Sequence, residues 1–260
     1  NKVTSSLSGI LTPGNLIILE STVPVGTTLA LRDNLKKMRP DLNFEEEGEG
    51  ACIMIAHCPE RVLPGNVLHE LKYNDRVVGG INKKSSLAAA EFYKNFVKGK
   101  IYLTDSKTAE LTKLTENSFR DVNIAFANEI SSICEEEDVD VWELIDMANK
   151  HPRVNILQPG PGVGGHCIAV DPWFIVSSSS ENSKLIRAAR EVNDSKPQKV
   201  ISKILKTANS LGENSSLSIT SLGLAFKKDI DDLRESPALE IVKEINRMGF
   251  KNHFIVEPNI

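Results

Sequence analysis

The stretch Asn15-Leu-Ile-Ile-Leu-Glu20 decides the fold, because a continuous apolar run of this length is typical of a β-strand that is covered on both faces. It leads into Ser21-Thr-Val-Pro-Val-Gly-Thr27, after which residues 26–38 show a helical pattern. In α/β folds, ligands bind where a strand runs into such a turn and a helix. Simple N-capping explains Ser21 and Thr22 equally well, so both interpretations stay open.

Further elements are predicted on either side of this stretch. Residues 1–12 have the pattern of the end of a helix, and residues 84–97 that of a complete helix. Strands are predicted near residues 51–56, 75–81 and 100–104. The order strand, helix, strand, strand, helix, strand predicts an α/β fold for the first hundred residues. The acidic residues 45–50 predict a solvated loop rather than a metal site.

A long helix is predicted from about residue 106 to residue 137. The spacing of Lys113, Asn117 and Arg120 places an ammonium, an amide and a guanidinium on one face of that helix. A solvated polar face is the usual explanation for such a row. The neighbouring apolar positions are predicted to form the buried face: Leu111, Leu114, Val122, Phe126, Ile130 and Ile133.

The second half of the chain is predicted to be mainly helical and then to return to strands. Residues 177–180 are predicted to be a linker and cap. Helices are expected at 140–150, 182–193 and 197–210, with Pro197 as the first residue of the last one. After a domain boundary at 211–215, a strand at 217–222, a helix at 237–248 and a strand at 252–256 predict one βαβ unit.

The composition is that of an ordinary globular chain of about two domains, with 260 residues, 40% of them hydrophobic and 25% charged. The net charge of −4 and the pI near 5.8 argue against a nucleic-acid or membrane-surface partner. No apolar run approaches the roughly 20 residues of a membrane span. The four cysteines form no C-x-x-C pair, which indicates a reducing compartment and predicts a cytoplasmic protein.

A second stretch carries the chemistry: Gly160-Pro-Gly-Val-Gly-Gly-His-Cys-Ile-Ala-Val-Asp-Pro-Trp-Phe174. Its glycines let backbone N–H groups converge where a side chain would block them. A cysteine among such donors, with cationic groups nearby, can act as a nucleophile, which makes Cys167 the candidate. The alternative is a plain turn with a buried cysteine, since free cysteine often lies in a protein core.

The same stretch formally matches G-x-G-x-x-G, the dinucleotide fingerprint. That fingerprint needs a strand before it and a helix after it. Here Gln158-Pro159 precedes the match, Pro161 lies inside it and Pro172 soon follows, so we reject a dinucleotide site in this loop. Adjacent residues such as His166 and Cys167 cannot easily chelate one metal ion, so no metal site is predicted.

Several motifs together resemble the UDP-glucose/GDP-mannose dehydrogenase family, in order and over essentially the whole chain. They are the Ser21 turn, Cys58-Pro-Glu-Arg-Val-Leu-Pro-Gly65, Lys113-Leu-Thr-Glu-Asn117, the glycine stretch, Gly223-Leu-Ala-Phe-Lys227 and Asp232-Leu-Arg-Glu-Ser-Pro237. The run from His151 to Phe174 most resembles the branch that acts on UDP-N-acetyl-D-mannosamine. The resemblance implies an oxidoreductase of polysaccharide biosynthesis that uses NAD to oxidise the C6 hydroxyl of a UDP-sugar to a carboxylate in two steps.

The resemblance also implies catalytic roles. Cys167 matches the nucleophile that attacks the intermediate aldehyde, giving a thiohemiacetal and then a thioester that water hydrolyses. Lys113 matches a lysine that favours the thiolate and stabilises the oxyanion, and Asn117 matches the amide that holds the same oxygen. Asp171 matches the aspartate that orients this lysine and a water. Glu60 matches the acid/base of thioester hydrolysis.

Binding roles follow from the same resemblance. An arginine before the glycine loop can, in the family, reach the substrate of the neighbouring subunit. The positions that match UDP-sugar contacts are Arg61, Val62, Lys113, Asn117, Arg120, His151, Arg153, Gly164, Phe226 and Lys227. Thr22 and Arg234 match NAD contacts.

The resemblance implies three parts and a homodimer whose sites are completed across the interface. Residues 1–105 correspond to a partial Rossmann-type NAD-binding domain. Residues 106–211 correspond to a central long-helix dimerisation domain with the catalytic loop, and residues 212–260 to the start of a second Rossmann-like, UDP-binding domain. The family begins with a strand and a true glycine fingerprint that this sequence lacks, so the chain is expected to lack the start of its NAD-binding domain and the C-terminal end.

Two alternatives remain open at this stage. One is oxidation of UDP-glucose or UDP-N-acetylglucosamine by the same chemistry. The other is a non-catalytic nucleotide-sugar-binding or dimerisation module, which the missing phosphate loop would favour.

Overall fold

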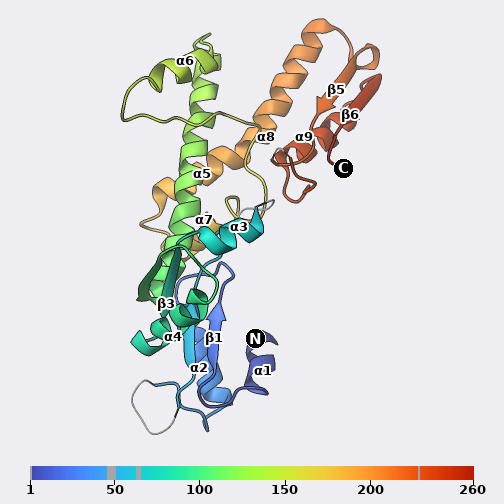
Figure 1. The fold of residues 1–260 in the computed structure, drawn as a ribbon. Coiled ribbons are helices and arrows are strands. Elements are labelled where there is room, and N and C mark those ends of the chain that lie inside the picture. The colour runs from blue at the N-terminus through green and yellow to red at the C-terminus, as the bar shows by residue number, and fades with distance from the viewer. Residues whose placement is uncertain (1, 46–50, 63–65, 228) are drawn as a thin grey trace. The chain divides into compact units, whose positions relative to one another are not determined.

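The computed structural model describes residues 2–45, 51–62, 66–227 and 229–260 (Figure 1). The chain forms two compact units, Asn1–Thr115 and Glu116–Ile260. Each unit has its own clusters of buried hydrophobic side chains. Most of the predicted acidic loop, residues 46–50, lies outside the described residues.

The first unit contains a four-stranded sheet in the order β1-β2-β3-β4. Its strands are β1 (Leu16–Leu19), β2 (Met54–His57), β3 (Arg76–Gly80) and β4 (Ile101–Asp105). β1 and β2 are parallel, β2 and β3 are antiparallel, and β3 and β4 are parallel. The helices are α1 (Lys2–Ser8), α2 (Thr27–Met38), α3 (Val67–Tyr73) and α4 (Lys83–Lys94). The predicted α/β fold is confirmed.

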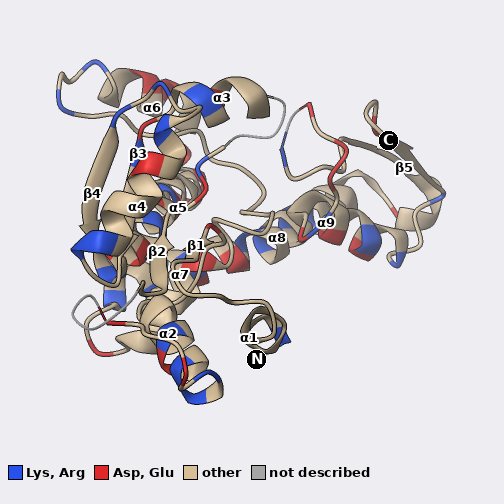
Figure 2. Cartoon of the chain, turned by 60° about the horizontal axis from the view of Figure 1, so that its bottom comes forward, with Lys and Arg blue, Asp and Glu red and all other residues tan. Residues whose placement is uncertain are grey.

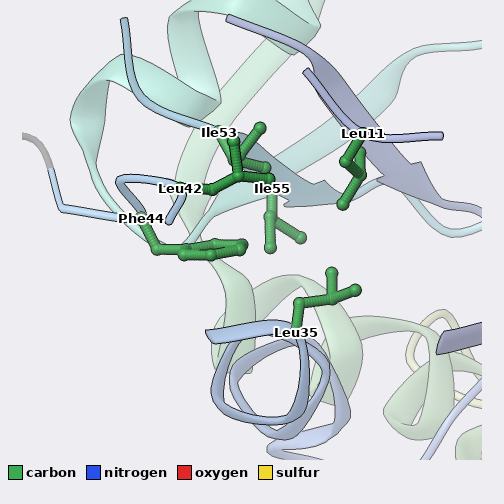
Figure 3. Close-up of a cluster of buried hydrophobic side chains, with 6 residues drawn as sticks. All are labelled: Leu11, Leu35, Leu42, Phe44, Ile53 and Ile55. Carbon is green, nitrogen blue, oxygen red and sulfur yellow. The ribbon is translucent and has the colours of Figure 1, made fainter. Parts of the chain in front are cut away.

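The side chains of β1 confirm that this strand is covered on both faces. Ile17 and Leu19 pack against a cluster that includes Leu35 of α2. Leu16 and Ile18 pack against a second cluster, which includes residues of α4. Successive side chains of a strand point to opposite faces, so a strand with a core on each face must be apolar throughout. Figure 3 shows the buried residues of the first cluster: Leu11, Leu35, Leu42, Phe44, Ile53 and Ile55.

Helix α3 was missing from the sequence-based prediction. None of its residues is buried, so its sequence has no apolar stripe to reveal it. On α2, basic and acidic residues are mixed along the exposed face (Figure 2). Arg32 pairs with Asp33, and Lys36 pairs with Glu45. Among the described residues, no helix combines the length and the hydrophobicity that a membrane crossing requires.

The second unit is built on long helices. Helix α5 (Ser106–Glu136) runs into it from the first unit, and α6 (Val141–Ala148), α7 (Asp171–Ser178), α8 (Lys184–Leu211) and the 3-10 turn η1 (Asn214–Ser216) follow. Strand β5 (Ser218–Leu222), helix α9 (Pro237–Asn246) and strand β6 (Asn252–Val256) complete the unit. β5 and β6 pair in parallel, which confirms the predicted βαβ unit.

Two predictions about this unit are wrong, and a proline is involved in each. Ser177 and Ser178 form the last turn of α7 rather than a linker, because Pro172 starts a helix instead of breaking one. The two helices predicted at 182–193 and 197–210 are one helix, α8, with Pro197 inside it. Pro197 is buried, and its ring lies next to Gly162 of the glycine loop.

The prediction for the faces of α5 is also wrong. Of the six apolar positions expected to be buried, only Leu114 is fully buried, and Leu111, Phe126 and Ile133 are between 43% and 51% exposed. Six of the eleven buried positions of this helix are polar: Ser106, Glu110, Asn117, Ser118, Asp121 and Asn128. Hydrogen bonds to other segments make this arrangement possible, because a buried polar group needs a partner.

Replacement of Leu35 tests the packing of the first unit. Leu35→Ala should lower the free energy of unfolding by about 2–5 kcal/mol, because this side chain is fully buried between α2 and the sheet. The matched control is Leu68→Ala on α3, where the side chain is 84% exposed and the change should stay within about 0.5 kcal/mol. Urea unfolding measures both, and equal losses would contradict the described core.

Candidate active site

The buried face of α5 is a row of polar side chains. Glu110, Asn117, Asp121 and Asn128 are each at most 3% exposed. They follow one another at intervals of seven, four and seven residues, so they lie along one side of the helix. Each of them is hydrogen-bonded to residues of another segment. The row therefore ties α5 to several loops and helices.

In the first unit, Glu110 holds the turn that follows β1. Its carboxylate accepts the N–H groups of Gly26 at 2.5 Å and Thr28 at 2.7 Å, and the hydroxyl of Thr28 at 2.6 Å. Gly26 has φ +93°, a left-handed conformation that favours glycine. The first amides of α2 are thus engaged by a carboxylate of the chain itself.

In the second unit, Asn117 and Asp171 are in direct contact beside Cys167. The amide of Asn117 donates to Oδ2 of Asp171 at 2.5 Å, and both side chains are 3% exposed. The backbone N–H of Asp171 donates to the carbonyl of Cys167 at 2.9 Å. The structure therefore joins Asn117 to Asp171 by a side-chain hydrogen bond, and Asp171 to Cys167 through the backbone.

Cys167 is exposed, whereas Cys52, Cys58 and Cys134 are free and buried. The alternative of a plain turn with a buried cysteine is therefore wrong. Burial raises the pKa of the Cys58 thiol, although hydrogen bonds with Tyr93 and Arg76 oppose the rise. A thiol-directed reagent should therefore react at Cys167 well before it reaches the buried cysteines.

The glycines before Cys167 are required by close packing. A Cβ atom on Gly164 would lie 2.6 Å from Cβ of Phe226 and 2.8 Å from Cδ of Pro237. A Cβ atom on Gly165, where φ is +81°, would lie 2.8 Å from the ring of Phe226. These distances are shorter than ordinary van der Waals contact, so only glycine fits. The loop thus packs directly on the segments before α9, and the predicted substrate residues Gly164 and Phe226 are in contact.

A hollow of about 520 Å³ opens between this loop, α8, and the segment that leads into and includes α9. His166 lies on its wall, next in sequence to Cys167. Polar and charged residues of α8 and α9 complete the lining, among them Arg190, Asn193 and Lys243. A space of this size suits part of a nucleotide-sized ligand.

In the first unit, Glu60 follows β2 and has both carboxylate oxygens engaged. Oε1 accepts the N–H groups of Arg61 at 2.7 Å and Val62 at 3.0 Å. Oε2 lies 3.7 Å from Nη1 of Arg76, a guanidinium that is 5% exposed and stacks over the ring of Tyr93. Arg76 therefore holds the Glu60 carboxylate from a buried position. Sequence reasoning did not single out Arg76.

The other predicted residues of the first unit are half-buried. Thr22 lies in the turn after β1, and Arg61 and Val62 follow Glu60. Lys113 lies on α5, one turn before Asn117. These residues belong to segments that begin at the carboxyl ends of β1 and β2 and at the start of α5.

The described residues fit part of an NAD site. The carboxyl ends of the parallel strands β1 and β2 form the edge where α/β folds hold a ligand, and Thr22 lies there. A diphosphate often binds free amides at a helix N-terminus. At α2, however, Glu110 already occupies the N–H groups of Gly26 and Thr28. These two N–H groups are therefore not free to hold the diphosphate of the cofactor.

The remaining predicted binding residues lie on exposed segments. His151 and Arg153 are on the loop after α6, which Asn149 closes by hydrogen bonds to both backbone groups of Ile156. Arg120 is on the exposed side of α5, and Lys227 is also exposed. Arg234 forms an ion pair with Asp232 at 2.7 Å, which lowers the pKa of Asp232 to about 2. Among the described residues, no hydrogen bond links His151 or Arg153 to the glycine loop.

Comparison with known proteins assigns the family. The chain matches the NAD binding domain of the UDP-glucose/GDP-mannose dehydrogenase family over residues 1–97. It matches the central domain of that family over residues 107–195 and the UDP binding domain over residues 220–260. The chain belongs to this family. The resemblance inferred from the motifs is confirmed.

Similar proteins within the family carry two different names. The chain is 56% identical over 256 residues to an NDP-N-acetyl-D-galactosaminuronic acid dehydrogenase of Ralstonia nicotianae, covering 98% of this chain and 60% of the relative. It is also 56% identical over 257 residues to a UDP-N-acetyl-D-mannosamine dehydrogenase of Campylobacter jejuni, covering 98% and 62%. A solved UDP-D-ManNAc dehydrogenase of Pyrococcus horikoshii is 40% identical with a TM-score of 0.88, covering 99% and 60%. The chain thus spans about 60% of the length of these family members.

The sequence analysis did not identify the buried polar residues that hydrogen-bond to the segments carrying the predicted site residues. They are Glu110, Asp121 and Asn128 on α5, and Arg190 and Asn193 on α8. One signal could have found the first three: together with Asn117 they form a polar row at helical spacing in a helix whose apolar row lies elsewhere. No comparable pattern marks the α8 residues, because their burial follows from packing against α5.

A pair of glycine substitutions tests the packing of the loop. Gly164→Ala should destabilise the protein and change the rate at which Cys167 reacts with a thiol reagent, because the new methyl would overlap Phe226 and Pro237. Gly160→Ala is the matched control, since a Cβ atom there meets nothing within 4 Å. Thermal unfolding and thiol titration measure both effects. Equal behaviour of the two variants would contradict the described loop.

Proposed function

We propose that the protein containing this chain is an NAD-dependent nucleotide-sugar 6-dehydrogenase that converts UDP-N-acetyl-D-mannosamine to UDP-N-acetyl-D-mannosaminuronate. The observation that carries the proposal is the exposed Cys167 beside the buried pair Asn117 and Asp171. Family membership and the relatives named for UDP-N-acetyl-D-mannosamine support it.

The chemistry depends on the thiol of Cys167. NAD, when bound, accepts a hydride in each of the two oxidations. After the first one, the sulfur adds to the C6 carbonyl carbon, and the carbonyl oxygen takes a proton to give a thiohemiacetal. Loss of the C6 hydride together with the hydroxyl proton from this adduct gives a thioester. Water then displaces the thiol and leaves the carboxylate, so the reactive aldehyde is not released.

Lys113, Asn117 and Asp171 assist this chemistry in the proposal. Lys113 supplies a positive charge that stabilises the oxyanion at each step. Asn117 is one helical turn further along α5, and its bond to Asp171 fixes the orientation of its amide. A fixed amide stabilises charge better than a mobile one, because it needs no reorganisation during the reaction. Asp171 orients Lys113 and the water.

Glu60 is the acid/base for thioester hydrolysis. The backbone amides of Arg61 and Val62 hold one carboxylate oxygen, and Arg76 lies beside the other. This arrangement keeps the carboxylate in one orientation, as proton transfer to or from a water requires.

The remaining predicted contacts surround the two ligands in this proposal. Thr22 would hold the nicotinamide, and Arg234 would supply a positive charge to the cofactor diphosphate. The UDP-sugar contacts are Arg61, Val62, Lys113, Asn117, Arg120, His151, Arg153, Gly164, Phe226 and Lys227. The absence of paired cysteines and the nucleotide substrates support a cytoplasmic location.

A second sugar is favoured by a specific observation. The Ralstonia relative, named for N-acetyl-D-galactosaminuronic acid, is as similar to this chain as the Campylobacter relative named for N-acetyl-D-mannosamine. Oxidation of an N-acetylgalactosamine nucleotide is therefore the second candidate. The two substrates need the same C6 chemistry and differ in ring stereochemistry.

Turnover of a panel of sugars tests the proposal. The panel contains the UDP derivatives of N-acetylmannosamine, N-acetylgalactosamine, N-acetylglucosamine and glucose. We expect the highest kcat/KM for UDP-N-acetylmannosamine, with two NADH per uronate. Cys167→Ala should reduce uronate formation by at least about a thousandfold, because it removes the covalent step. The control is Cys134→Ala, which changes a buried thiol. Normal uronate formation by Cys167→Ala would refute the mechanism, and no turnover of any sugar would favour the non-catalytic module.

We also propose that the protein is a homodimer that pairs through α5 and α6. Phe119, Phe126 and Ile133 recur every seven residues on α5 and are between 46% and 69% exposed. Trp142 and Met147 on α6 are 56% and 60% exposed. An apolar stripe at seven-residue spacing is what one helix presents to another, so a second copy of this chain is the occupant that we propose. In the dimer, Arg153 reaches the substrate of the neighbouring subunit.

A charge placed in this stripe tests the dimer. Phe126→Asp should convert the dimer to a monomer in light scattering, because it buries an unpaired carboxylate in the interface. Leu68→Asp is the control, since this side chain is 84% exposed on another helix and the mass should not change. A wild-type protein that is monomeric at all concentrations would refute the proposal.

A further inference from the structure

Two amides of α5 hold the two ends of the segment that contains Cys167. Oδ1 of Asn128 accepts the N–H of Gly160 at 2.9 Å, and Asn117 holds Asp171. Asn117 and Asn128 are eleven residues apart on a helix, which is about 16 Å. Residues 160 and 171 are also eleven apart, and an extended chain of that length reaches about 36 Å. The segment is therefore longer than the distance that it spans, so contacts with other residues must determine its conformation.

Asn128 is the end of a buried chain of hydrogen bonds between α5 and α8. Oδ1 of Asp121 accepts from Nη1 of Arg190 at 2.7 Å and from Nδ2 of Asn193 at 2.8 Å. Oδ1 of Asn193 then accepts from Nδ2 of Asn128 at 2.9 Å. Asp121, Asn128, Arg190 and Asn193 are all at most 1% exposed.

The direction of this chain is fixed by the charge at its start. The carboxylate of Asp121, paired with Arg190, only accepts hydrogen bonds, so Asn193 must turn its NH₂ group toward it. The oxygen of Asn193 then faces Asn128, which must turn its own NH₂ group toward Asn193. This leaves the oxygen of Asn128 facing the N–H of Gly160. The backbone carbonyl of Asp121 accepts from the same NH₂ group of Asn193 at 3.1 Å, so the carboxylate and the carbonyl of Asp121 together set the orientation of both amides.

We propose that Asn128 is a positioning residue for the glycine loop, and that Asp121 and Asn193 fix its orientation so that it holds Gly160. The role for catalysis rests on the proposed function, because it is Cys167 that the loop presents. Asn128 acts through the backbone of Gly160, seven residues before the thiol. A loop released at Gly160 would keep its contacts with Phe226 but lose its fixed course toward Cys167.

Hydrogen exchange at Gly160 tests the proposal directly. Pro159 and Pro161 have no amide hydrogen, so a peptide that covers residues 159–162 reports only on Gly160 and Gly162. In Asn128→Ala, exchange at Gly160 should become about tenfold faster, as expected when one hydrogen bond is lost. The control is Asn123→Ala on the same helix, where the amide bonds only to the carbonyl of Phe119 and exchange at Gly160 should not change.

A variant that moves the negative charge from residue 121 to residue 128 tests whether the orientation of the Asn193 amide matters, or only the volume of these side chains. Asn128→Asp places an acceptor against the oxygen of Asn193 and should weaken the hold on Gly160. Adding Asp121→Asn removes the original charge, which lets Asn193 turn over and donate to the new carboxylate while Gly160 keeps an acceptor. The backbone carbonyl of residue 121 still favours the original orientation of Asn193, so exchange at Gly160 should become slower than in Asn128→Asp without reaching the wild-type rate. If Asn128→Asp does not fold but the double variant does, this rescue supports the proposal in the same way.

The proposal is overturned if Asn128→Ala leaves exchange at Gly160 unchanged, or if the double variant is no better than Asn128→Asp. In each variant, the rate at which Cys167 reacts with 5,5′-dithiobis(2-nitrobenzoic acid) should change when the hydrogen-exchange rate at Gly160 changes, and should stay at the wild-type value when it does not. Neither measurement needs cofactor or sugar, so a protein that oxidises no UDP-sugar would refute the proposed function and leave this result standing.

Discussion

The structure depends on one constraint: the buried side of α5 carries polar side chains, and four of them, Glu110, Asn117, Asp121 and Asn128, need partners on other segments. In the second unit, Asn117, Asp121 and Asn128 find theirs on α7, α8 and the glycine loop. Most helices bury an apolar stripe, which packs without strict direction. Hydrogen bonds have direction, so a polar stripe also fixes how each attached segment is oriented. In the proposed function, this precision would help Cys167 to meet one carbon atom of a sugar.

The same principle operates in the first unit with charged groups. Glu110 binds the amides at the start of α2 and so fixes the turn that carries Thr22. Arg76, buried against Tyr93, holds one oxygen of Glu60 while backbone amides hold the other. In both cases a buried charged side chain orients a segment at the carboxyl ends of the strands. Such charges are tolerated because each is paired or hydrogen-bonded.

Much of the fold could be predicted from the sequence, because it follows from local patterns. The apolar run 15–20 indicated a strand covered on both faces, and the clusters on both sides of β1 explain why. Helix α3 could not be predicted, since it buries nothing. Pro197 was taken to start a helix, but it lies inside α8, where its packing next to Gly162 depends on tertiary structure.

In the candidate site too, some residues could be predicted from sequence motifs and others could not. The family motifs led to Cys167, Asn117 and Asp171, and the structure joins Asn117 to Asp171 and bonds the backbone N–H of Asp171 to the carbonyl of Cys167. The residues behind them, Asn128 and Asn193, belong to no motif. Their importance comes from contacts between helices that are distant in sequence, which a pattern in one segment cannot show. The prediction of the buried face of α5 was wrong because its exposed apolar residues have the same sequence pattern as core residues. Such residues can be covered by a partner surface instead of a core.

A crystal structure of the protein with UDP-N-acetyl-D-mannosamine is the most direct measurement of the central claim, that the buried amides of α5 place the reactive thiol. The account predicts that C6 of the sugar lies next to the sulfur of Cys167, with Asn117 bonded to Asp171 and Asn128 bonded to Gly160. A complex in which C6 lies away from Cys167 while both amides keep these contacts would contradict it.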